Sequence, residues 1–107
     1  MTRIAVYGSL KKGKYNHPII KDSEYAGDTK LRGTLYRVSS YPALVDEGDN
    51  EYPAELYDVE DSVLQYVRMM ELGAGYKEKV VDGAIVYYAG DFLAERCRNN
   101  YEKIDSY

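Results

Sequence analysis

Basic residues are too few in this chain to make its surface positive. Lysine and arginine together number 14 against 18 aspartates and glutamates, which gives a net charge of −4. Binding to polyphosphate usually needs clustered positive charge, and the one basic cluster is short, Lys11-Lys12-Gly13-Lys14. We therefore expect no nucleic-acid partner.

Cysteine and long apolar runs are also scarce. The single cysteine, Cys97, cannot form an internal disulfide, so nothing in the sequence requires an oxidising compartment. No stretch approaches the ~18 apolar residues of a membrane-spanning helix. Met1-Thr2-Arg3 leads directly into a strand pattern without the apolar region of a signal peptide. We expect a cytoplasmic protein with no membrane partner.

Histidine occurs once, as His17, and this limits the chemistry. Without another base, neither a Ser-His-Asp triad nor a His-based metal site can be assembled convincingly. No spacing of acidic residues resembles a calcium loop. We interpret His17 as a structural or solvated residue, and we expect neither a metal nor another cofactor.

Tyrosine replaces the other aromatic residues, with 13 Tyr against one Phe and no Trp. Tyrosine favours pleated, half-wet surfaces, so this composition agrees with a β-rich fold. A chain of 107 residues fits one domain, 1–107. Strand patterns outnumber helical ones, which predicts an α+β fold with a small, mainly antiparallel, barrel-like sheet, one main helix and short extra helices.

Strand-like patterns and turn signals divide much of the chain. The strand segments are 3–7, 23–38, 41–45, 52–57, 79–81 and 84–88. Acidic residues with one glycine predict a turn at Asp46–Asn50, and Asp82-Gly83 predicts a two-residue hairpin turn.

Helical patterns are fewer. The main helix is predicted over 60–71 with Asp58 as its cap. Asn16-His17-Pro18 predicts a short helical turn with Asn16 as its cap. A last helix is predicted over 92–101, and we expect the final residues to fray.

The first strand pattern ends in Val6-Tyr7-Gly8-Ser9-Leu10, a turn suited to holding an anion or a carbonyl oxygen. Glycine has no Cβ, so Gly8 can adopt a positive φ and admit a ligand close to the main chain. The N–H groups of Ser9 and Leu10 are candidates for free donors, able to steady an oxyanion. The alternative interpretation is a plain chain reversal.

The same loop matches part of a nucleotide-binding P-loop, since Gly8 to Lys14 fit G-x-x-x-x-G-K. We reject this interpretation. Tyr15 stands where Ser or Thr would hold magnesium, and Pro18 spoils the long helix that should follow. No later βαβ units exist to build the parallel sheet.

Glu71 differs from the other acidic residues by its place on the main helix. The apolar stripe of that helix is Val63, Val67 and Met70, joined by Tyr66. Glu71 lies on or beside this stripe, which predicts an inward carboxylate. Burial raises the pKa of a carboxyl group, so Glu71 could accept and return a proton near neutrality. The alternative is that Glu71 closes the helix and bends outward.

Several segments together carry a family resemblance over residues 3 to about 88. They are Val6-Tyr7-Gly8-Ser9-Leu10 with Gly13, Gly33-Thr34-Leu35-Tyr36, Tyr41-Pro42-Ala43-Leu44, Glu55-Leu56-Tyr57-Asp58-Val59, a helix closing on Glu71, Tyr76, and a Val-rich hairpin. With these segments the chain resembles the γ-glutamylcyclotransferase-like fold, a group that includes γ-glutamylamine cyclotransferases and AIG2-like proteins.

The resemblance implies a reaction and a set of residues. In that family the loop after the first strand binds the γ-glutamyl group through its backbone, and a glutamate at the end of the long helix is the general acid/base. Glu71 would be catalytic, and the substrate-binding residues would be Tyr7, Gly8, Ser9, Leu10 and Tyr76. The α-amine of a γ-glutamyl compound would attack its own γ-carbonyl, forming 5-oxoproline and releasing an amine or amino acid without a cofactor.

Two positions depart from the family pattern. Ala54 stands where many members have glycine, and Tyr76-Lys77-Glu78 places an acid where they commonly have arginine. Lys77, Lys79 or the Lys11-to-Lys14 cluster could replace that arginine, or the substrate could differ. The alternative function is a non-catalytic protein that binds or sequesters a small anionic ligand on the same fold. A protein-interaction domain with a vestigial pocket is a third.

Overall fold

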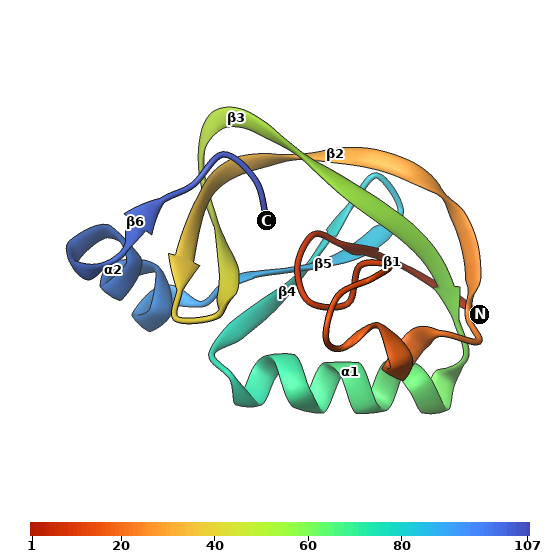
Figure 1. The fold of residues 1–107 in the computed structure, drawn as a ribbon. Coiled ribbons are helices and arrows are strands. Elements are labelled where there is room, and N and C mark those ends of the chain that lie inside the picture. The colour runs from red at the N-terminus through yellow and green to blue at the C-terminus, as the bar shows by residue number, and fades with distance from the viewer.

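A computed structural model describes residues 1–107 and shows one curled sheet with helices beside it (Figure 1). The strands are β1 (Thr2–Val6), β2 (Glu24–Val38), β3 (Tyr41–Val59), β4 (Tyr76–Val81), β5 (Ala84–Ala89) and β6 (Glu102–Lys103). The helices are α1 (Asp61–Gly73), α2 (Asp91–Asn100) and a short 3-10 helix, η1 (His17–Ile20).

The sheet has six strands in the order β4-β5-β1-β3-β2-β6. All neighbours pair antiparallel except β1 and β5, which are parallel. This confirms the predicted α+β class with a mainly antiparallel sheet. The long strands β2 and β3 curl over together, and the sheet remains an open half-barrel with β4 and β6 as its edges (Figure 1).

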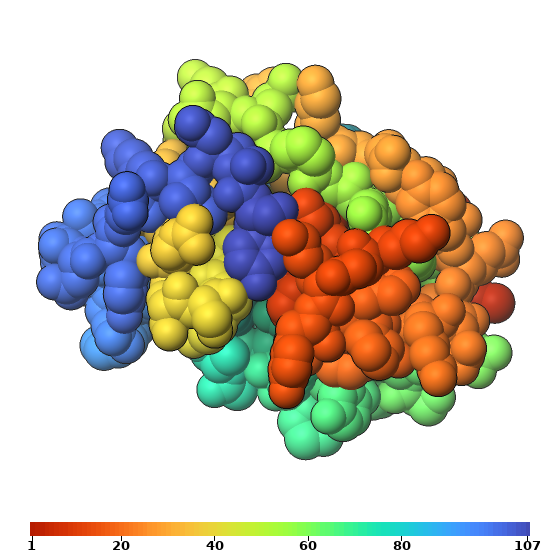
Figure 2. Space-filling view, in the orientation of Figure 1, coloured from red at the N-terminus to blue at the C-terminus, as the bar shows by residue number.

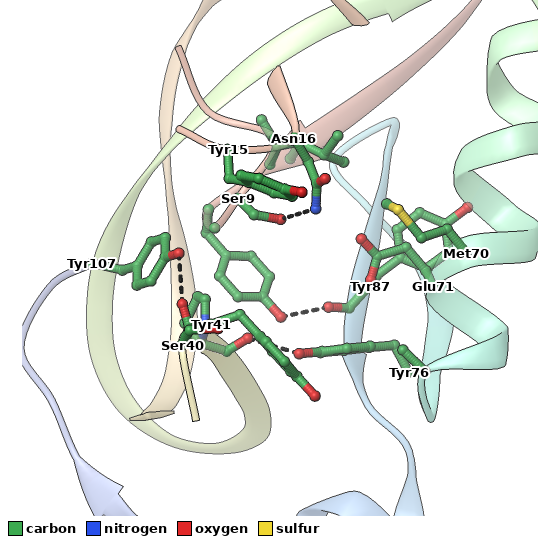
Figure 3. A pocket seen from close by; sticks show the side chains of 17 residues that line it. Ser9, Tyr15, Asn16, Ser40, Tyr41, Met70, Glu71, Tyr76, Tyr87 and Tyr107 are labelled. Carbon is green, nitrogen blue, oxygen red and sulfur yellow. Dashed lines mark hydrogen bonds between the residues drawn. The ribbon is translucent and has the colours of Figure 1, made fainter. Parts of the chain in front are cut away.

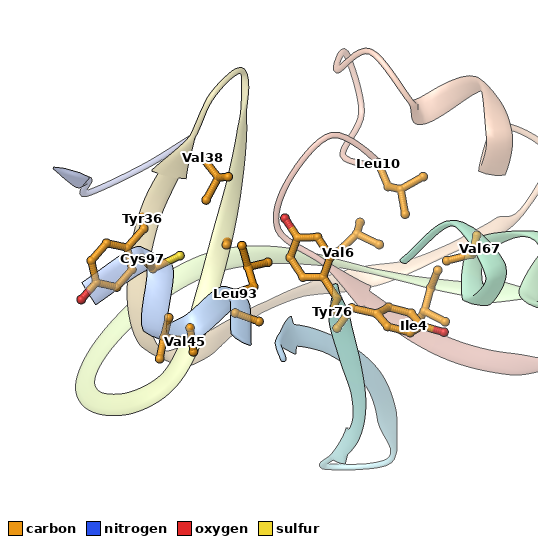
Figure 4. Packing of buried hydrophobic residues seen from close by; sticks show 14 of the residues in the cluster. Ile4, Val6, Leu10, Tyr36, Val38, Val45, Val67, Tyr76, Leu93 and Cys97 are labelled. Carbon is orange, nitrogen blue, oxygen red and sulfur yellow. The ribbon is translucent and has the colours of Figure 1, made fainter. Parts of the chain in front are cut away.

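Both faces of the sheet are covered by buried apolar side chains, because neighbouring residues of a strand point to opposite faces. Ile4 and Val6 of β1 belong to one cluster, which also holds Val67 of α1 and Leu93 of α2 (Figure 4). Ala5 belongs to a second cluster. β1 is thus a central strand buried on both sides, and the loop that follows it starts inside the molecule. No helix combines the length and apolar character needed to cross a membrane.

The hairpin turn at Asp82-Gly83 is confirmed. It joins β4 to β5, and both residues have positive φ, 51° and 82°. Two positive φ values are the signature of the type I′ turn that fits the twist of an antiparallel pair. The helical turn at Pro18 and the last helix are also present, as η1 and α2. Asn16 is the N-cap residue of η1, but its side chain makes no capping hydrogen bond.

The prediction of a turn at Asp46–Asn50 is wrong, because the chain does not reverse there. β3 continues through it, with Thr34 of β2 opposite Val45 and Gly33 opposite Asn50. Residues 46–49 therefore bulge out of the ladder while pairing with β2 resumes on both sides.

The predicted cap of α1 is also wrong, although the helix begins at Asp61, one residue from its predicted start. Asp58 belongs to β3, where it accepts a 2.8 Å hydrogen bond from Nε of Arg3. Glu60 is the N-cap residue, and it makes no side-chain capping bond. Tyr66 does not join the apolar stripe, since it is 57% exposed, whereas Leu64 is buried beside Val67.

The final residues do not fray as expected. Glu102–Lys103 form β6 against β2, and the N–H of Ile104 donates a 2.9 Å bond to the main-chain oxygen of Leu35. Beyond β6, the Tyr107 hydroxyl donates a 3.0 Å bond to the main-chain oxygen of Ser40, so the end of the chain lies against the β2–β3 turn.

Candidate functional site

A cavity of about 520 Å³ opens beside the loop that follows β1 (Figure 3). Its walls come from the end of β1 and its loop, the β2–β3 turn, the last turn of α1, β4, β5 and the end of the chain. The lining residues are Ala5, Val6, Tyr7, Gly8, Ser9, Leu10, Tyr15, Asn16, Ser40, Tyr41, Pro42, Met70, Glu71, Ala74, Tyr76, Tyr87 and Tyr107. All six residues singled out from the sequence for the site are among them.

Gly8 is required at its position by space and not by backbone conformation. The prediction of a positive φ at Gly8 was wrong, since other glycines adopt one and Gly8 does not. A Cβ at this position would lie 2.9 Å from Cγ of Pro42, a separation that real Cβ atoms essentially never show. The loop therefore packs directly against the start of β3, which closes one side of the cavity.

The carbonyls of the loop are tied down while two of its N–H groups are not. The main-chain oxygen of Gly8 accepts a 3.0 Å bond from the N–H of Lys11, and that of Ser9 accepts a 2.8 Å bond from Asn16. The Asn16 side chain also donates to Oγ of Ser9 at 2.9 Å. No hydrogen bond within the protein uses the N–H of Ser9 or Leu10. These two donors remain available to a ligand.

His17 supports the same loop from behind. Its Nδ1 lies 2.9 Å from the main-chain oxygen of Leu10, and its ring packs 5.7 Å from that of Tyr57. His17 does not line the cavity. Its contacts agree with the structural interpretation of this residue.

Two buried tyrosines connect the cavity walls. The Tyr7 hydroxyl donates to the main-chain oxygen of Tyr87 at 2.7 Å and accepts the N–H of Leu44 at 3.1 Å. The Tyr76 hydroxyl donates to the main-chain oxygen of Pro42 at 2.8 Å. Burial raises the pKa of both phenols, so they stay protonated and keep these bonds at neutral pH.

Glu71 lies in the last turn of α1, half-buried, and its carboxylate faces the cavity (Figure 3). It has no ion-pair partner, and burial alone raises its pKa to about 7. At neutral pH the group is therefore present in both protonation states, which is the condition a general acid/base needs. Among the residues that line the cavity, Glu71 is also the one with a charged side chain.

Glu78, which stands in the place of the family's arginine, faces a basic residue from α1. It forms an ion pair with Arg68 and accepts a 2.7 Å bond from the Tyr87 hydroxyl. Lys77 pairs with Asp91 at 3.5 Å, and Lys79 pairs with Asp46 at 2.7 Å. Neither lysine lines the cavity, so the structure argues against both as replacements for the arginine.

Sequence reasoning missed several residues of the cavity. Tyr87 lies on the predicted hairpin. Its side chain points to the face of the sheet opposite to those of Val86 and Tyr88, an alternation that the strand pattern could have revealed. Met70 was assigned to the apolar stripe alone. No sequence pattern placed Tyr41 or Tyr107 near the loop after β1, because both arrive there through tertiary contacts.

A family model described as "Gamma-glutamyl cyclotransferase, AIG2-like" matches residues 4–105. A protein of Pyrococcus horikoshii named "Putative gamma-glutamylcyclotransferase" is 32% identical over 75 residues, which cover 70% of this chain and 64% of that protein. The mouse protein "Gamma-glutamylaminecyclotransferase" is 28% identical over 105 residues, which cover 85% of this chain and 69% of its own length. The matches to archaeal and Vibrio cholerae relatives span 60% to 64% of those proteins.

Solved structures share the fold. The crystal structure of an uncharacterized P. horikoshii protein superposes with a TM-score of 0.80 at 26% identity, covering 98% of this chain and 86% of that one. The crystal structure of a mouse AIG2-like protein also gives a TM-score of 0.80, at 21% identity, covering 100% of this chain and 88% of that one. At that identity, the mouse structure supports the fold alone.

Proposed function

This chain belongs to the gamma-glutamyl cyclotransferase, AIG2-like family, and from this premise we propose that it cyclises a γ-glutamyl compound to 5-oxoproline and releases an amine or an amino acid. The observation that carries the proposal is the position of Glu71. This carboxyl group, with its pKa raised to about 7, lines the same cavity as the loop of residues 7–10.

Glu71 moves the proton in the proposed reaction. The α-amine nitrogen of the substrate forms a bond to the γ-carbonyl carbon, and the bond from that carbon to the leaving nitrogen then breaks. Glu71 accepts a proton from the attacking nitrogen and returns it to the leaving nitrogen, so the carboxylate is regenerated. A pKa near the working pH suits both transfers.

The loop after β1 stabilises the charge that develops on the γ-carbonyl oxygen. The free N–H groups of Ser9 and Leu10 are the donors available for it. A donor of this kind contributes on the order of a hundredfold or more in rate in comparable sites. Ser9 and Leu10 lie in a loop that Asn16, His17 and Pro42 hold in place, so the donors need little reorganisation.

The reaction also requires the substrate to be folded back on itself, and the cavity can hold it in that conformation. Its volume of about 520 Å³ suits a small molecule of a γ-glutamyl amine's size. The attacking amine and the carbonyl belong to one molecule. When binding holds these two groups together, much of the entropy is lost before the reaction, and the activation barrier is lower. The mostly aromatic and apolar walls are suited to that role.

The decisive test is release of 5-oxoproline from a panel of γ-glutamyl amines and γ-glutamyl amino acids, measured by mass spectrometry. Turnover of at least one substrate supports the proposal. The alternative, a protein that binds a small anionic ligand without converting it, predicts saturable binding of the same compounds and no 5-oxoproline. The identity of residue 78 favours this alternative. Glu78 stands where the family commonly has an arginine, and it forms an ion pair with Arg68.

A further inference from the structure

The cavity lacks a positive charge that the proposed substrate needs. A γ-glutamyl compound carries an α-carboxylate, yet no lysine, arginine or histidine lines the cavity, and its one charged side chain, that of Glu71, is itself acidic. A carboxylate placed beside Glu71 without a cation would be costly. The counter-charge must therefore come from the rim.

Many basic residues of the protein are already paired with carboxylates elsewhere. The ion pairs are Arg3 with Asp58, Arg68 with Glu78, Lys77 with Asp91, Lys79 with Asp46, and Arg98 with Glu47. Neither Lys11 nor Lys14 pairs with an aspartate or a glutamate, and Lys11 directly follows the lining residue Leu10. Of the two, Lys11 is half-buried and Lys14 is exposed.

Lys11 currently donates to an oxygen atom at the entrance of the cavity. Its Nζ lies 3.0 Å from the main-chain oxygen of Tyr107, whose side chain lines the cavity. The Tyr107 hydroxyl donates a 3.0 Å bond to the main-chain oxygen of Ser40 on the opposite wall. Nζ of Lys14 lies 4.9 Å from the centre of the Tyr107 ring. Figure 2 shows the end of the chain filling the gap between the β2–β3 turn, in yellow, and the loop after β1, in orange-red.

We propose that Lys11 is the residue that binds the α-carboxylate of the substrate, and that the main-chain oxygen of Tyr107 holds its ammonium group at the rim until the substrate displaces it. This inference rests on the proposed function and names a specificity-determining residue of the same site. The exchange keeps the Lys11 ammonium group bonded to an oxygen acceptor throughout, and the carboxylate of the substrate offers it two oxygen atoms. Partial burial of Lys11 strengthens the new contact further.

A matched pair of ligands and a matched pair of variants test the role of Lys11. The ligands are L-glutamine and its α-carboxamide analogue, which keeps the α-amine and the γ-amide but has no carboxylate. The variants are Lys11→Met and Lys12→Met, and Lys12 is a suitable control because its side chain is exposed and makes no hydrogen bond. Lys11→Met should weaken binding of L-glutamine in calorimetry by about tenfold. It should leave binding of the carboxamide unchanged, and Lys12→Met should alter neither.

A third variant tests whether Tyr107 competes with the substrate for Lys11. Tyr107→Ala removes the side-chain bond to Ser40 and loosens the segment that carries the main-chain oxygen. It should strengthen L-glutamine binding severalfold when Lys11 is present, and this gain should vanish in the double variant with Lys11→Met. Lys11→Arg should restore most of the binding lost in Lys11→Met, which would exclude a folding defect as the cause.

The outcomes separate this inference from the proposed function. If 5-oxoproline is released but Lys11→Met has the same KM and ligand affinity as Lys12→Met, the role of Lys11 is refuted and the function stands. If no γ-glutamyl compound is converted but L-glutamine binding depends on Lys11 and on the carboxylate, the cyclotransferase proposal fails and the carboxylate site stands. Equal weakening of both ligands by Lys11→Met would also overturn the inference.

Discussion

The Tyr7 hydroxyl donates a 2.7 Å hydrogen bond to the main-chain oxygen of Tyr87. Tyr7 follows β1 and Tyr87 lies in β5, and the same hydroxyl accepts the N–H of Leu44 in β3. One buried side chain thus joins three strands directly below the loop of residues 8–10. Because the strands are fixed at this point, the loop begins from a rigid base.

Tyr7→Phe should destabilise the protein, because it leaves the N–H of Leu44 and the main-chain oxygen of Tyr87 without their partner in a buried place. We expect the free energy of unfolding to fall by about 1–3 kcal/mol in urea titrations. Tyr66→Phe, on the exposed side of α1, is the control and should change it by less than ~0.5 kcal/mol. Equal stability of the two variants would show that the bonded hydroxyl contributes nothing.

Gly8→Ala should be harmful for a steric reason. The added Cβ would lie 2.9 Å from Cγ and 3.2 Å from Cδ of Pro42, so the loop or β3 must shift. We expect a loss of about 1–3 kcal/mol in stability, together with weaker binding of γ-glutamyl ligands. Gly73→Ala has no atom within 4 Å of its Cβ and lies at the end of α1. Thermal melts of both variants measure the difference: Gly73→Ala should be neutral or stabilising by up to ~1 kcal/mol, and a Gly8→Ala variant that behaves likewise would contradict the steric argument.

Local chemistry was enough to predict the elements whose geometry depends on near neighbours. Asp82-Gly83 takes the two positive φ values that a type I′ turn demands, and α1 follows its helical pattern. The turn at Asp46–Asn50 failed because pairing with β2, a long-range interaction, continues on both sides of it. Asp58 failed as a cap for a similar reason, since its carboxylate is taken by Arg3 of a different strand.

The candidate site could be predicted only in part. Glu71 was identified because helical spacing relates it to Val67, and the glycine loop because it follows a strand. Gly8 was assigned the right importance for the wrong reason, since the neighbour that demands glycine, Pro42, lies on another strand. Tyr107 could not be foreseen, because its place at the cavity depends on the pairing of β6 with β2.

The buried carboxyl group of Glu71 should make stability depend on pH. Its pKa is about 7 in the folded protein against an ordinary value of 4.5, so between these pH values the folded state binds more protons than the unfolded state. The free energy of unfolding should therefore fall as pH rises from about 4.5 to 7 on account of this group. In Glu71→Gln that part of the decline should be absent, so the variant should gain stability over the wild type at pH 8 and not at pH 4.5. Parallel stability curves for the two proteins would contradict the raised pKa.

Glu71→Gln should also abolish most of the cyclisation. Glutamine keeps the shape of the side chain but cannot accept the proton of the attacking amine, so kcat/KM should fall by at least ~100-fold. In the wild type, kcat/KM should rise with pH up to about 7 and then level, because the carboxylate is the active form and its pKa is about 7. This limb should be missing from the residual activity of the variant. Glu95→Gln, an exposed substitution on α2, should keep both the rate and the pH profile of the wild type. If Glu71→Gln and Glu95→Gln retain equal activity, the proton is carried by another group and Glu71 only lines the cavity.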